Sequence, residues 1–468
     1  MSPGRSGWGI CGLCLLWVLS TLSGVIPPLA RATDTTAQEA DSGARKTDFW
    51  SRFKKVQVGP ASLDFGGQAR VRYEFQDGFT LKGYEPGGHD NLLLERVRLN
   101  FDLRLPEGRP RLFVQLQDAH AFLTKYNDDD FPKSNPIEDL LDVRQAYLEW
   151  LRIVGSPVGL RVGRQQISYG DQRIFGPGNW GNTGRYAWEA AMVKVETEQV
   201  AADFWVGRYL QYKSAFWPDR ALEDFLTFVG YAQVRKLPFR FDLFYALKDD
   251  SRGTAKGEFR TGNLFMHTAG FQAEGVFLKL WNAGVTFVGQ FGRQAGDTVR
   301  AFGANAKIGA KPPLLWSPEL TAQYTWGSGD HDPTDGVHGT FDGVFGGRDI
   351  FFYGYLNLFF WANLRDAEID LTVRPHQYLA AYLAFHHFEL DQARDAWYTT
   401  SLRAYRRDPN GLSGRQLGQE LDFRLVWTVW NHLEFMGGYG RFFPGSFVRR
   451  TGPASPANWF FFQTLYSW

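Results

Sequence analysis

The sequence lacks cysteine almost completely, and beyond its first 32 residues it lacks long apolar segments. Its two cysteines, Cys11 and Cys14, both lie in that first segment. No later run approaches the roughly 18 apolar residues of a membrane-spanning helix. Lys+Arg and Asp+Glu total 51 and 50, which leaves a formal net charge of +1. These absences exclude disulfides and cysteine-ligated metals beyond the first segment, a helical membrane protein, and a basis for nucleic-acid binding.

Common catalytic motifs are also absent. The sequence contains no glycine-rich phosphate loop, nucleophile elbow or zinc-binding helix motif. A hydrolase with its site at a barrel wall would have to use His386, His387 or His432, and no nucleophile motif accompanies them. His386 and His387 are adjacent, so they would lie on opposite faces of a strand and would not share a metal. We therefore expect no enzymatic activity.

The first 60 residues have the composition of targeting and lead-in segments. Arg5 precedes an apolar stretch from residue 8 to 29, and Ala30 and Ala32 supply small residues, which is typical of a secretory signal peptide over residues 1–32. Residues 33–60 are polar, mixed in charge and without alternation, which predicts a mobile periplasmic lead-in.

From residue 62 onward, the dominant pattern is alternation with a period of two. Residues 65–75 place apolar side chains on one face and Gln, Arg and Glu on the other, and residues 96–105, 367–373 and 420–427 repeat this arrangement. Such stretches predict strands with one apolar and one charged face. In a barrel wall, lipid-facing apolar residues alternate with polar residues that face the lumen. Their average explains why the mean hydropathy is only -0.32.

The connections between these stretches come in two lengths. Short turns are expected near 106–110, 155–157, 198–199, 237–238, 375–376 and 431–432. Long loops are expected over 124–141, 169–188, 211–222, 250–262, 327–362, 391–417 and 444–457. About eighteen strands fit between them, an even number as a closed single-chain barrel requires. Residues 61–468 therefore predict an all-β transmembrane antiparallel β-barrel with short periplasmic turns and long extracellular loops.

The last strand supports the same location. Residues 459–468 alternate and end on the aromatic Trp468, which resembles the signal by which outer-membrane barrels are recognised for insertion. We expect an integral protein of the Gram-negative outer membrane, in contact with its lipid and lipopolysaccharide.

Arginine dominates the cations, since 37 Arg and 14 Lys make up the 51. The guanidinium fork fits a carboxylate in two-point geometry, whereas lysine offers a point charge. Five arginines have the lumen-facing phase of their strands: Arg70, Arg72, Arg96, Arg98 and Arg424. A path lined by such groups would attract anions that carry carboxylates, provided that each group binds weakly enough to release them.

The most specific stretch spans residues 142–188. It contains Gly163-Arg164-Gln165, Gly170-Asp171-Gln172-Arg173, then Trp180, Asn182-Thr183 and Gly184-Arg185, after a strand with Val143-Arg144-Gln145-Ala146-Tyr147. These motifs resemble those of the alginate export family of outer-membrane proteins, and a similar layout extends over residues 62–468. The resemblance implies an eighteen-stranded barrel whose positively charged constriction passes an acidic polysaccharide. It also implies that Arg144, Arg164, Asp171, Arg173 and Arg185 line the pore.

Two of these arginines conflict with strict alternation. Arg164 shares the phase of Leu160 and Val162, which would direct it to lipid, and we expect a bulge at Gly163 to turn it inward. Arg144 has the same problem against Ala146 and its neighbours.

The loop over residues 169–188 follows a strand that runs toward the outside. It could fold inward to narrow the pore, and an aromatic such as Tyr169 or Trp180 could stack on a sugar ring. Acidic residues should hold the arginines in place: Asp102, Asp171, Glu368 and Asp422.

The one cofactor considered is calcium. Asp330, Asp332 and Asp335, and separately Asp128, Asp129 and Asp130, have spacing similar to that of calcium ligands, although neither stretch completes a binding-loop pattern.

The leading functional hypothesis is passive export of an anionic polysaccharide, alginate or a relative, from periplasm to cell surface, with periplasmic export partners. The alternatives are uptake of small organic anions or oligouronates, the hydrolase above, and a purely structural barrel with a plugged lumen.

Overall fold

The computed structural model describes residues 49–106, 109–131 and 134–468, so the predicted signal peptide lies outside the described residues. Eighteen strands form one closed antiparallel β-barrel, which confirms the predicted fold class. Each barrel strand pairs with the next along the chain, and β2 (Ala61–Thr80) closes the ring by pairing with β23 (Ala457–Ser467). No helix among the described residues is long and apolar enough to cross a bilayer.

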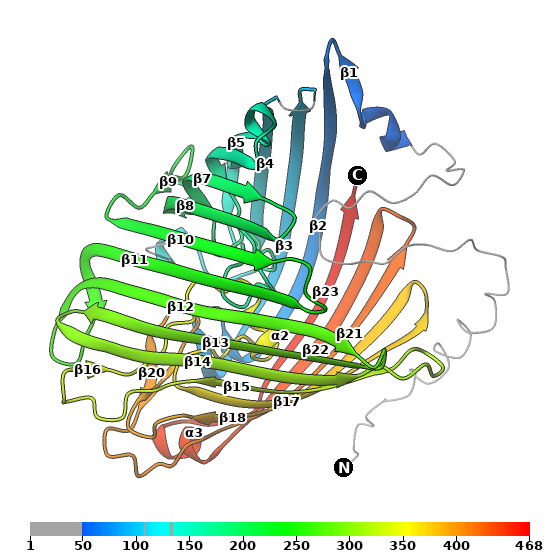
Figure 1. The fold of residues 1–468 in the computed structure, drawn as a ribbon. Coiled ribbons are helices and arrows are strands. Elements are labelled where there is room, and N and C mark those ends of the chain that lie inside the picture. Colours follow the sequence, from blue (N-terminus) through cyan, green and yellow to red (C-terminus); the bar gives the residue numbers. More distant parts are fainter. Residues whose placement is uncertain (1–48, 107–108, 132–133) are drawn as a thin grey trace, which may run out of the picture. The chain divides into compact units, whose positions relative to one another are not determined.

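The remaining barrel strands follow in chain order (Figure 1). They are β3 (Gly83–Arg104), β4 (Arg111–Phe122), β5 (Asp139–Trp150), β6 (Val158–Gln165), β7 (Trp188–Glu196), β8 (Val200–Gln211), β10 (Phe225–Val234), β11 (Arg240–Lys256), β12 (Thr261–Phe277), β13 (Trp281–Gln294), β14 (Asp297–Ala310), β15 (Glu319–Gly327), β17 (Leu364–His376), β18 (Leu379–Leu390), β21 (Gln416–Val429) and β22 (Leu433–Pro444).

Shorter strands, helices and turns lie outside the sequence of barrel strands. They are the strands β1 (Val56–Val58), β9 (Arg220–Ala221), β16 (Val337–His338), β19 (Ala396–Tyr398) and β20 (Ala404–Arg407), the helices α2 (Asp349–Phe352) and α3 (Ser446–Thr451), and the 3-10 turns η1 (Phe49–Phe53), η2 (Asp128–Asp130) and η3 (Ile153–Gly155).

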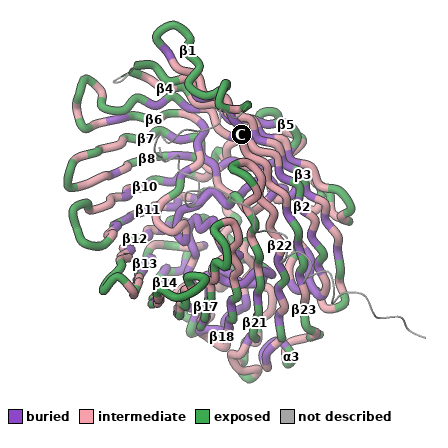
Figure 2. The backbone as a smooth tube through the Cα atoms, turned by 90° about the vertical axis from the view of Figure 1, so that its right-hand side faces the viewer, coloured by how far each residue is buried: buried purple, intermediate pink, exposed green. Residues whose placement is uncertain are grey.

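The alternation in the sequence corresponds to the two faces of the wall. Val71 is 48% exposed, whereas its neighbours Arg70 and Arg72 are 3% and 2% exposed. On β17, Ile369 is 54% exposed beside Glu368 at 3%. Figure 2 shows buried and exposed positions alternating along the strands. The outer face is therefore apolar and the inner face carries the charges, as a barrel in lipid requires.

The connections separate the barrel into two ends. The turn end carries the short segments, such as 197–199 and 430–432, and the loop end carries residues 166–187, 328–363 and 391–415. The long loop predicted over residues 250–262 is wrong. β11 and β12 continue through most of it after a register shift between Asp250 and Ala255, because backbone pairing continues regardless of side-chain polarity.

The end of the predicted lead-in packs against the barrel. Trp50 in η1 stacks on Trp468 with ring centroids 5.1 Å apart, and its indole N–H donates to the Tyr466 hydroxyl at 2.6 Å. β1 pairs with the start of β2. Residues 49–58 therefore differ from the unstructured segment that we expected, because aromatic side chains in them cover the closing strand.

Two loops fold into the ring: the first inward loop (166–187) and the second inward loop (328–363), which contains α2 (Figure 1). They join through backbone hydrogen bonds from Gly176 N to Phe345 O and from Phe345 N to Ile174 O, both 2.9 Å. Phe341, Phe359 and Trp361 of the second loop are fully buried. These aromatic segments gain the hydrophobic free energy of burial by packing against the inner wall.

Candidate functional site: an arginine-lined inner wall

Five of the predicted arginines come together on the inner face of neighbouring strands, and we call this group the basic wall. Its members are Arg70 and Arg72 on β2, Arg96 and Arg98 on β3, and Arg144 on β5. All five residues are at most 3% exposed. Alternation on β2 and β3 directs four of them inward, as predicted from their phase.

The basic wall holds the tip of the first inward loop. Arg70 donates to the carbonyl oxygens of Trp180 and Gly181 at 3.0 and 3.2 Å. Arg96 donates to the carbonyl oxygens of Asn179 and Gly181, both at 3.0 Å. The predicted inward fold of this loop thus depends on guanidinium groups that bind its backbone.

Side chains complete the contact. Arg98 donates to Gln117 at 2.8 Å and to the side-chain oxygen of Asn179 at 3.0 Å. Arg72 lies over the Trp180 ring, 4.2 Å from its centroid, and pairs with Glu74 at 2.7 Å.

The basic wall carries far more positive charge than negative charge. Among the described residues, Glu74 is the one carboxylate that forms an ion pair with any of its five arginines. The other partners are neutral carbonyl, amide or aromatic groups, and the Nε atoms of Arg70 and Arg96 have no hydrogen-bond partner. Buried like charges repel strongly where the effective dielectric constant is low. The wall is therefore suited to bind anionic groups.

Arg144 reaches the inner face through a bulge in its own strand. The pairing of β4 with β5 shifts between Gln115 and Leu116, so that Arg144 has no partner in the register. The extra residue restores the inward direction that strict alternation would deny it. Its guanidinium carbon lies 4.6 Å from the centroid of the Tyr212 ring.

Arg164 does not turn inward, and the bulge that we expected at Gly163 is absent. β6 pairs without a register shift with both β5 and β7. Arg164 therefore keeps the phase of Leu160 and Val162 and lies opposite Glu189, to which it donates at 2.9 Å.

Local contacts compensate for this outward position. Arg164 also donates to the carbonyl oxygen of Asp219, in the segment that follows β8, at 2.5 Å. Because it lies at the loop end of β6 and is paired, its charge does not face lipid alone. The prediction that Arg164 lines the pore is therefore wrong, because the strand register directs it outward.

Asp171 and Arg173 lie apart from the basic wall. They pair with each other at 3.6 Å, and Arg173 donates to Gln323 and Thr325 of β15 at 3.2 and 3.4 Å. Burial raises the pKa of Asp171, but the charge and backbone N–H of Arg173 outweigh burial and hold this pKa below its ordinary value. The pair fixes the first inward loop to a distant strand.

Arg185 and Arg424 also occupy separate places. Arg185 forms an ion pair with Asp349 and so ties the first inward loop to the second. Arg424 projects from β21 and lies over the Tyr382 ring, 4.1 Å from its centroid. Its partners are aromatic faces rather than carboxylates, which leaves its charge available to an anion.

The two aromatics predicted to meet a sugar are engaged within the protein. Tyr169 stacks on Tyr231 with centroids 4.1 Å apart. Trp180 packs edge-on against Phe461, with centroids 5.2 Å apart, besides its contact with Arg72. Each ring therefore already packs against other side chains of the protein.

The acidic residues follow two patterns. Asp102 binds Arg104 and Arg111, both on its own side of the wall, as expected. Glu368 and Asp422 instead surround His386, and their distances to its Nε2 are 3.7 and 3.9 Å. The sequence contained the alternating acids of β17 and β21, but it did not reveal that a histidine of β18 lies between them.

The three histidines considered for a hydrolase do not form one site. His386 points inward, while His387 on the other face of β18 pairs with Glu389 at 3.4 Å. The His432 ring lies 2.6 Å from the carbonyl oxygen of Ser467 at the turn end.

The residues considered as calcium ligands take part in hydrogen bonds within loops. Asp332 accepts from Thr334, Asp335 accepts from the Val337 backbone, and Asp330 donates its N–H to Asp395. Asp128–Asp130 form η2, capped by Asn127. Two other groups of the described residues bring three ligand atoms within 4.8 Å of one another: Asp366, Glu368, His386 and Asp139, Asp142, Asp219.

A pocket of about 330 Å³ lies at the turn end of β3 to β7. Its cationic lining residues are Arg104, Arg109, Arg111, Arg152 and Lys194, against the acids Glu149 and Glu196. The pocket lining therefore has more cations than acids, although Asp102 pairs with Arg104 and Arg111 and Asp203 pairs with Lys194.

Comparisons with known proteins agree with this architecture. A family model described as "Alginate export" matches residues 61–462. The fold is similar to that of OccAB2 from Acinetobacter baumannii, with a TM-score of 0.58, 11% identity, and coverage of 87% of this chain and 98% of that one. OccK8 (OprE) from Pseudomonas aeruginosa gives 0.58 and 9% with the same coverages. OccK11 (OpdR) from that organism gives 0.56 and 10%, with coverages of 86% and 95%. No curated protein sequence matches this chain.

Proposed function

This chain belongs to the alginate export family, and we propose that it carries an anionic polysaccharide, alginate or a related polyuronate, out of the cell through its arginine-lined lumen. The family and the fold support an outer-membrane porin channel rather than an enzyme. The turn end would face the periplasm and the loop end the exterior. Export would be passive, because continued supply of the polymer on the periplasmic side would drive its movement outward.

The observation that carries the proposal is the excess of guanidinium groups on the basic wall. Three of the five buried arginines, Arg70, Arg72 and Arg96, donate to the carbonyl oxygens of residues 179–181. Among the described residues, Glu74 is the one carboxylate that forms an ion pair with the group. A carboxylate accepts a charge-assisted hydrogen bond that is stronger than that of a neutral carbonyl. A uronate arriving at this wall can therefore displace the loop tip and take its donors.

The turn-end pocket supports the same direction of flow. Its cations lie where a chain from the periplasm would first meet the barrel. An excess of cations at the entrance raises the local concentration of an anionic polymer and its rate of capture. The carboxylates would then pass from the mouth to the basic wall.

The test is ion conduction by the purified protein in a planar bilayer. We expect a reversal potential that favours anions over cations, and we expect polyuronate to reduce the current more than neutral dextran of equal size. Cation preference, or equal block by the two polymers, would contradict the proposal. Block by short oligouronates without block by the polymer would favour small-anion uptake instead.

Variants of the wall sharpen this test. Arg70→Gln and Arg98→Gln should each weaken the anion preference and the block by polyuronate. Arg300→Gln is the matched control, because Arg300 on β14 is exposed on the outer phase opposite Phe291. An unchanged reversal potential in both wall variants would show that Arg70 and Arg98 do not line the path of the ions.

A further inference from the structure

A second charged group on the inner wall has the opposite sign and contains a histidine. Asp366 and Glu368 on β17, His386 on β18, and Glu420 and Asp422 on β21 occupy inward positions of adjacent strands. All five residues are at most 3% exposed. We propose that His386, Glu368 and Asp422 bind a divalent transition-metal ion inside the barrel.

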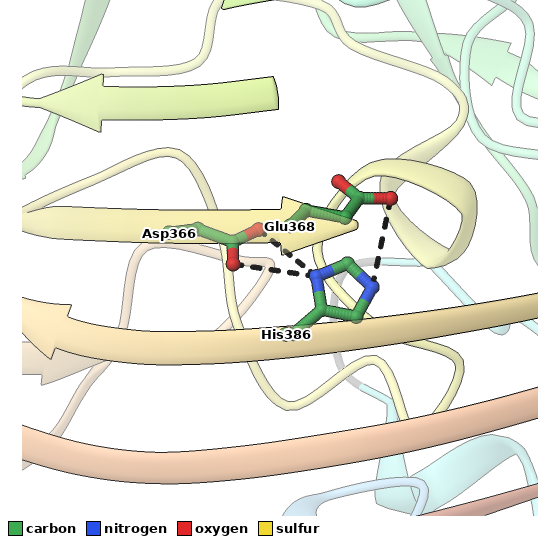
Figure 3. Close-up of side chains that lie close together, drawn as sticks. All are labelled: Asp366, Glu368 and His386. Atoms are coloured by element: carbon green, nitrogen blue, oxygen red, sulfur yellow. Dashed lines mark hydrogen bonds and ion pairs between the residues drawn. The ribbon is translucent and has the colours of Figure 1, made fainter. Parts of the chain in front are cut away.

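The orientation of the imidazole favours metal binding. Figure 3 shows Asp366 facing one ring nitrogen and Glu368 facing the other. The Nδ1 atom lies 3.1 Å from Asp366, which is hydrogen-bond distance. Donation from Nδ1 leaves the lone pair on Nε2, and a carboxylate that orients a histidine in this way is the usual outer partner of a metal-binding imidazole.

The distances on the Nε2 side suit shared ligands. The Glu368 and Asp422 oxygens lie 3.7 and 3.9 Å from Nε2, which is too far for a hydrogen bond. An ion bound tetrahedrally at about 2.0–2.2 Å from each ligand holds its ligand atoms about 3.3–3.6 Å apart. An ion bound at Nε2 would therefore need only a small movement of the Glu368 or Asp422 carboxylate to gain it as a ligand.

The acids of β21 near this histidine also carry oxygen atoms that lack a hydrogen-bond partner. Glu420 Oε2 and Asp422 Oδ1 are buried without a hydrogen-bond partner, and these residues are 0% and 1% exposed. In the part of the chain that the structure describes, no lysine or arginine forms an ion pair with Glu368, Glu420 or Asp422. Among the described residues, the His386 imidazole is the one basic group beside Glu368 and Asp422, and a divalent ion bound to it would supply more of the positive charge that buried carboxylates require.

The ligand set identifies the class of ion. Calcium prefers six to eight oxygen ligands, whereas one imidazole with two carboxylates suits zinc or manganese. The ion would lie beside the second inward loop, because Asp422 accepts the Tyr355 N–H at 3.0 Å and Glu420 accepts the Leu356 N–H at 2.9 Å. Metal binding would therefore fix this loop to the wall.

The experiment measures metal binding by the folded, tag-free full chain in detergent after treatment with a chelator. We expect it to bind one Zn²⁺ that His386→Gln and Asp422→Asn abolish, while Asp366→Asn weakens binding about tenfold. His387→Gln is the matched control, because the neighbouring histidine lies on the opposite face of β18. Folding of each variant is checked by its mobility on unheated gels.

A spectroscopic measurement covers variants that fail to fold. Mn²⁺ bound to the unaltered protein should show magnetic coupling to one imidazole nitrogen in pulsed electron paramagnetic resonance. Absence of that coupling, absence of stoichiometric Zn²⁺ binding, or equal binding by the His386→Gln variant would overturn the proposal. Binding at the other acidic group, Asp139 with Asp142 and Asp219, would appear as an ion that survives the His386 substitution and lacks nitrogen coupling.

Discussion

The guanidinium group of Arg70 and the side-chain oxygen of Asn182, 3.0 Å apart, join the inner wall to the tip of the first inward loop. The amide group of Asn182 also donates to the carbonyl oxygens of Glu95, His120 and Ile137. One buried asparagine therefore links the loop to β3, to β4 and to the segment before β5. This contact makes the position of the loop depend on the same arginines that would bind cargo.

Asn182→Ala should release the loop tip. The change removes the hydrogen bonds of the Asn182 amide group to three carbonyl oxygens and one of the hydrogen bonds of Arg70, and a buried hydrogen bond contributes about 0.5–1.5 kcal/mol. We expect faster hydrogen exchange over residues 177–185 and more frequent open events in single-channel records. Asn410→Ala, in an exposed loop, is the control. Equal exchange in the two variants would show that Asn182 does not hold the loop.

Arg185 and Asp349 should act as one unit that couples the two inward loops. Arg185→Gln and Asp349→Asn each remove one partner of the ion pair. Urea unfolding in detergent should show a double variant less destabilised than the sum of the singles, with a coupling of about 0.5–3 kcal/mol. Strict additivity would mean that the pair contributes nothing to stability.

Arg164→Gln should leave ion selectivity unchanged. Its guanidinium group lies on the outer phase, against Glu189 and Asp219, and not on the basic wall. We expect the reversal potential of the unaltered protein, together with faster proteolysis in the segment 212–221. A shift in reversal potential as large as that of Arg70→Gln would place Arg164 in the path after all.

The second inward loop should loosen as the pH rises. Burial, together with the charges of Asp395, Glu258 and Asp335, raises the pKa of Asp330 from 3.8 to about 7. The neutral acid is thus favoured in the folded loop. Its contribution to stability is complete below about pH 4 and is lost as the pH rises through about 7.

Hydrogen exchange over residues 328–340 at pH 5 and pH 8, corrected for intrinsic rates, measures this effect. Protection should fall between the two values in the unaltered protein and should change little in Asp330→Asn. A pH dependence that the variant retains would have to arise from another group.

The alternation of β2 and β3 was enough to predict the inner position of four arginines. Period-two burial follows from the pleat of any strand, so the direction of Arg70 or Arg98 required no knowledge of neighbours. The same argument misplaced the expected bulge. It occurs at Arg144, where β5 pairs with β4, and not at Gly163, because a bulge depends on the register of two strands.

The partners of the charges were harder to predict. We expected Glu368 and Asp422 to hold arginines, but the barrel places them on either side of His386. Which charges meet depends on strand neighbours that are up to tens of residues apart in sequence. The contacts of Tyr169 and Trp180 with Tyr231 and Phe461 could not be predicted for the same reason, because these partners lie on distant strands.

The sequence by itself determined that the chain is a β-barrel with an apolar outside and a charged inside, because local alternation and turn spacing dictate both. The tertiary structure alone decided that a second loop joins the first in the lumen, that the basic wall binds the first loop, and that a histidine lies among carboxylates. These contacts join residues from separate strands, and their energies depend on closure of the ring rather than on any local pattern.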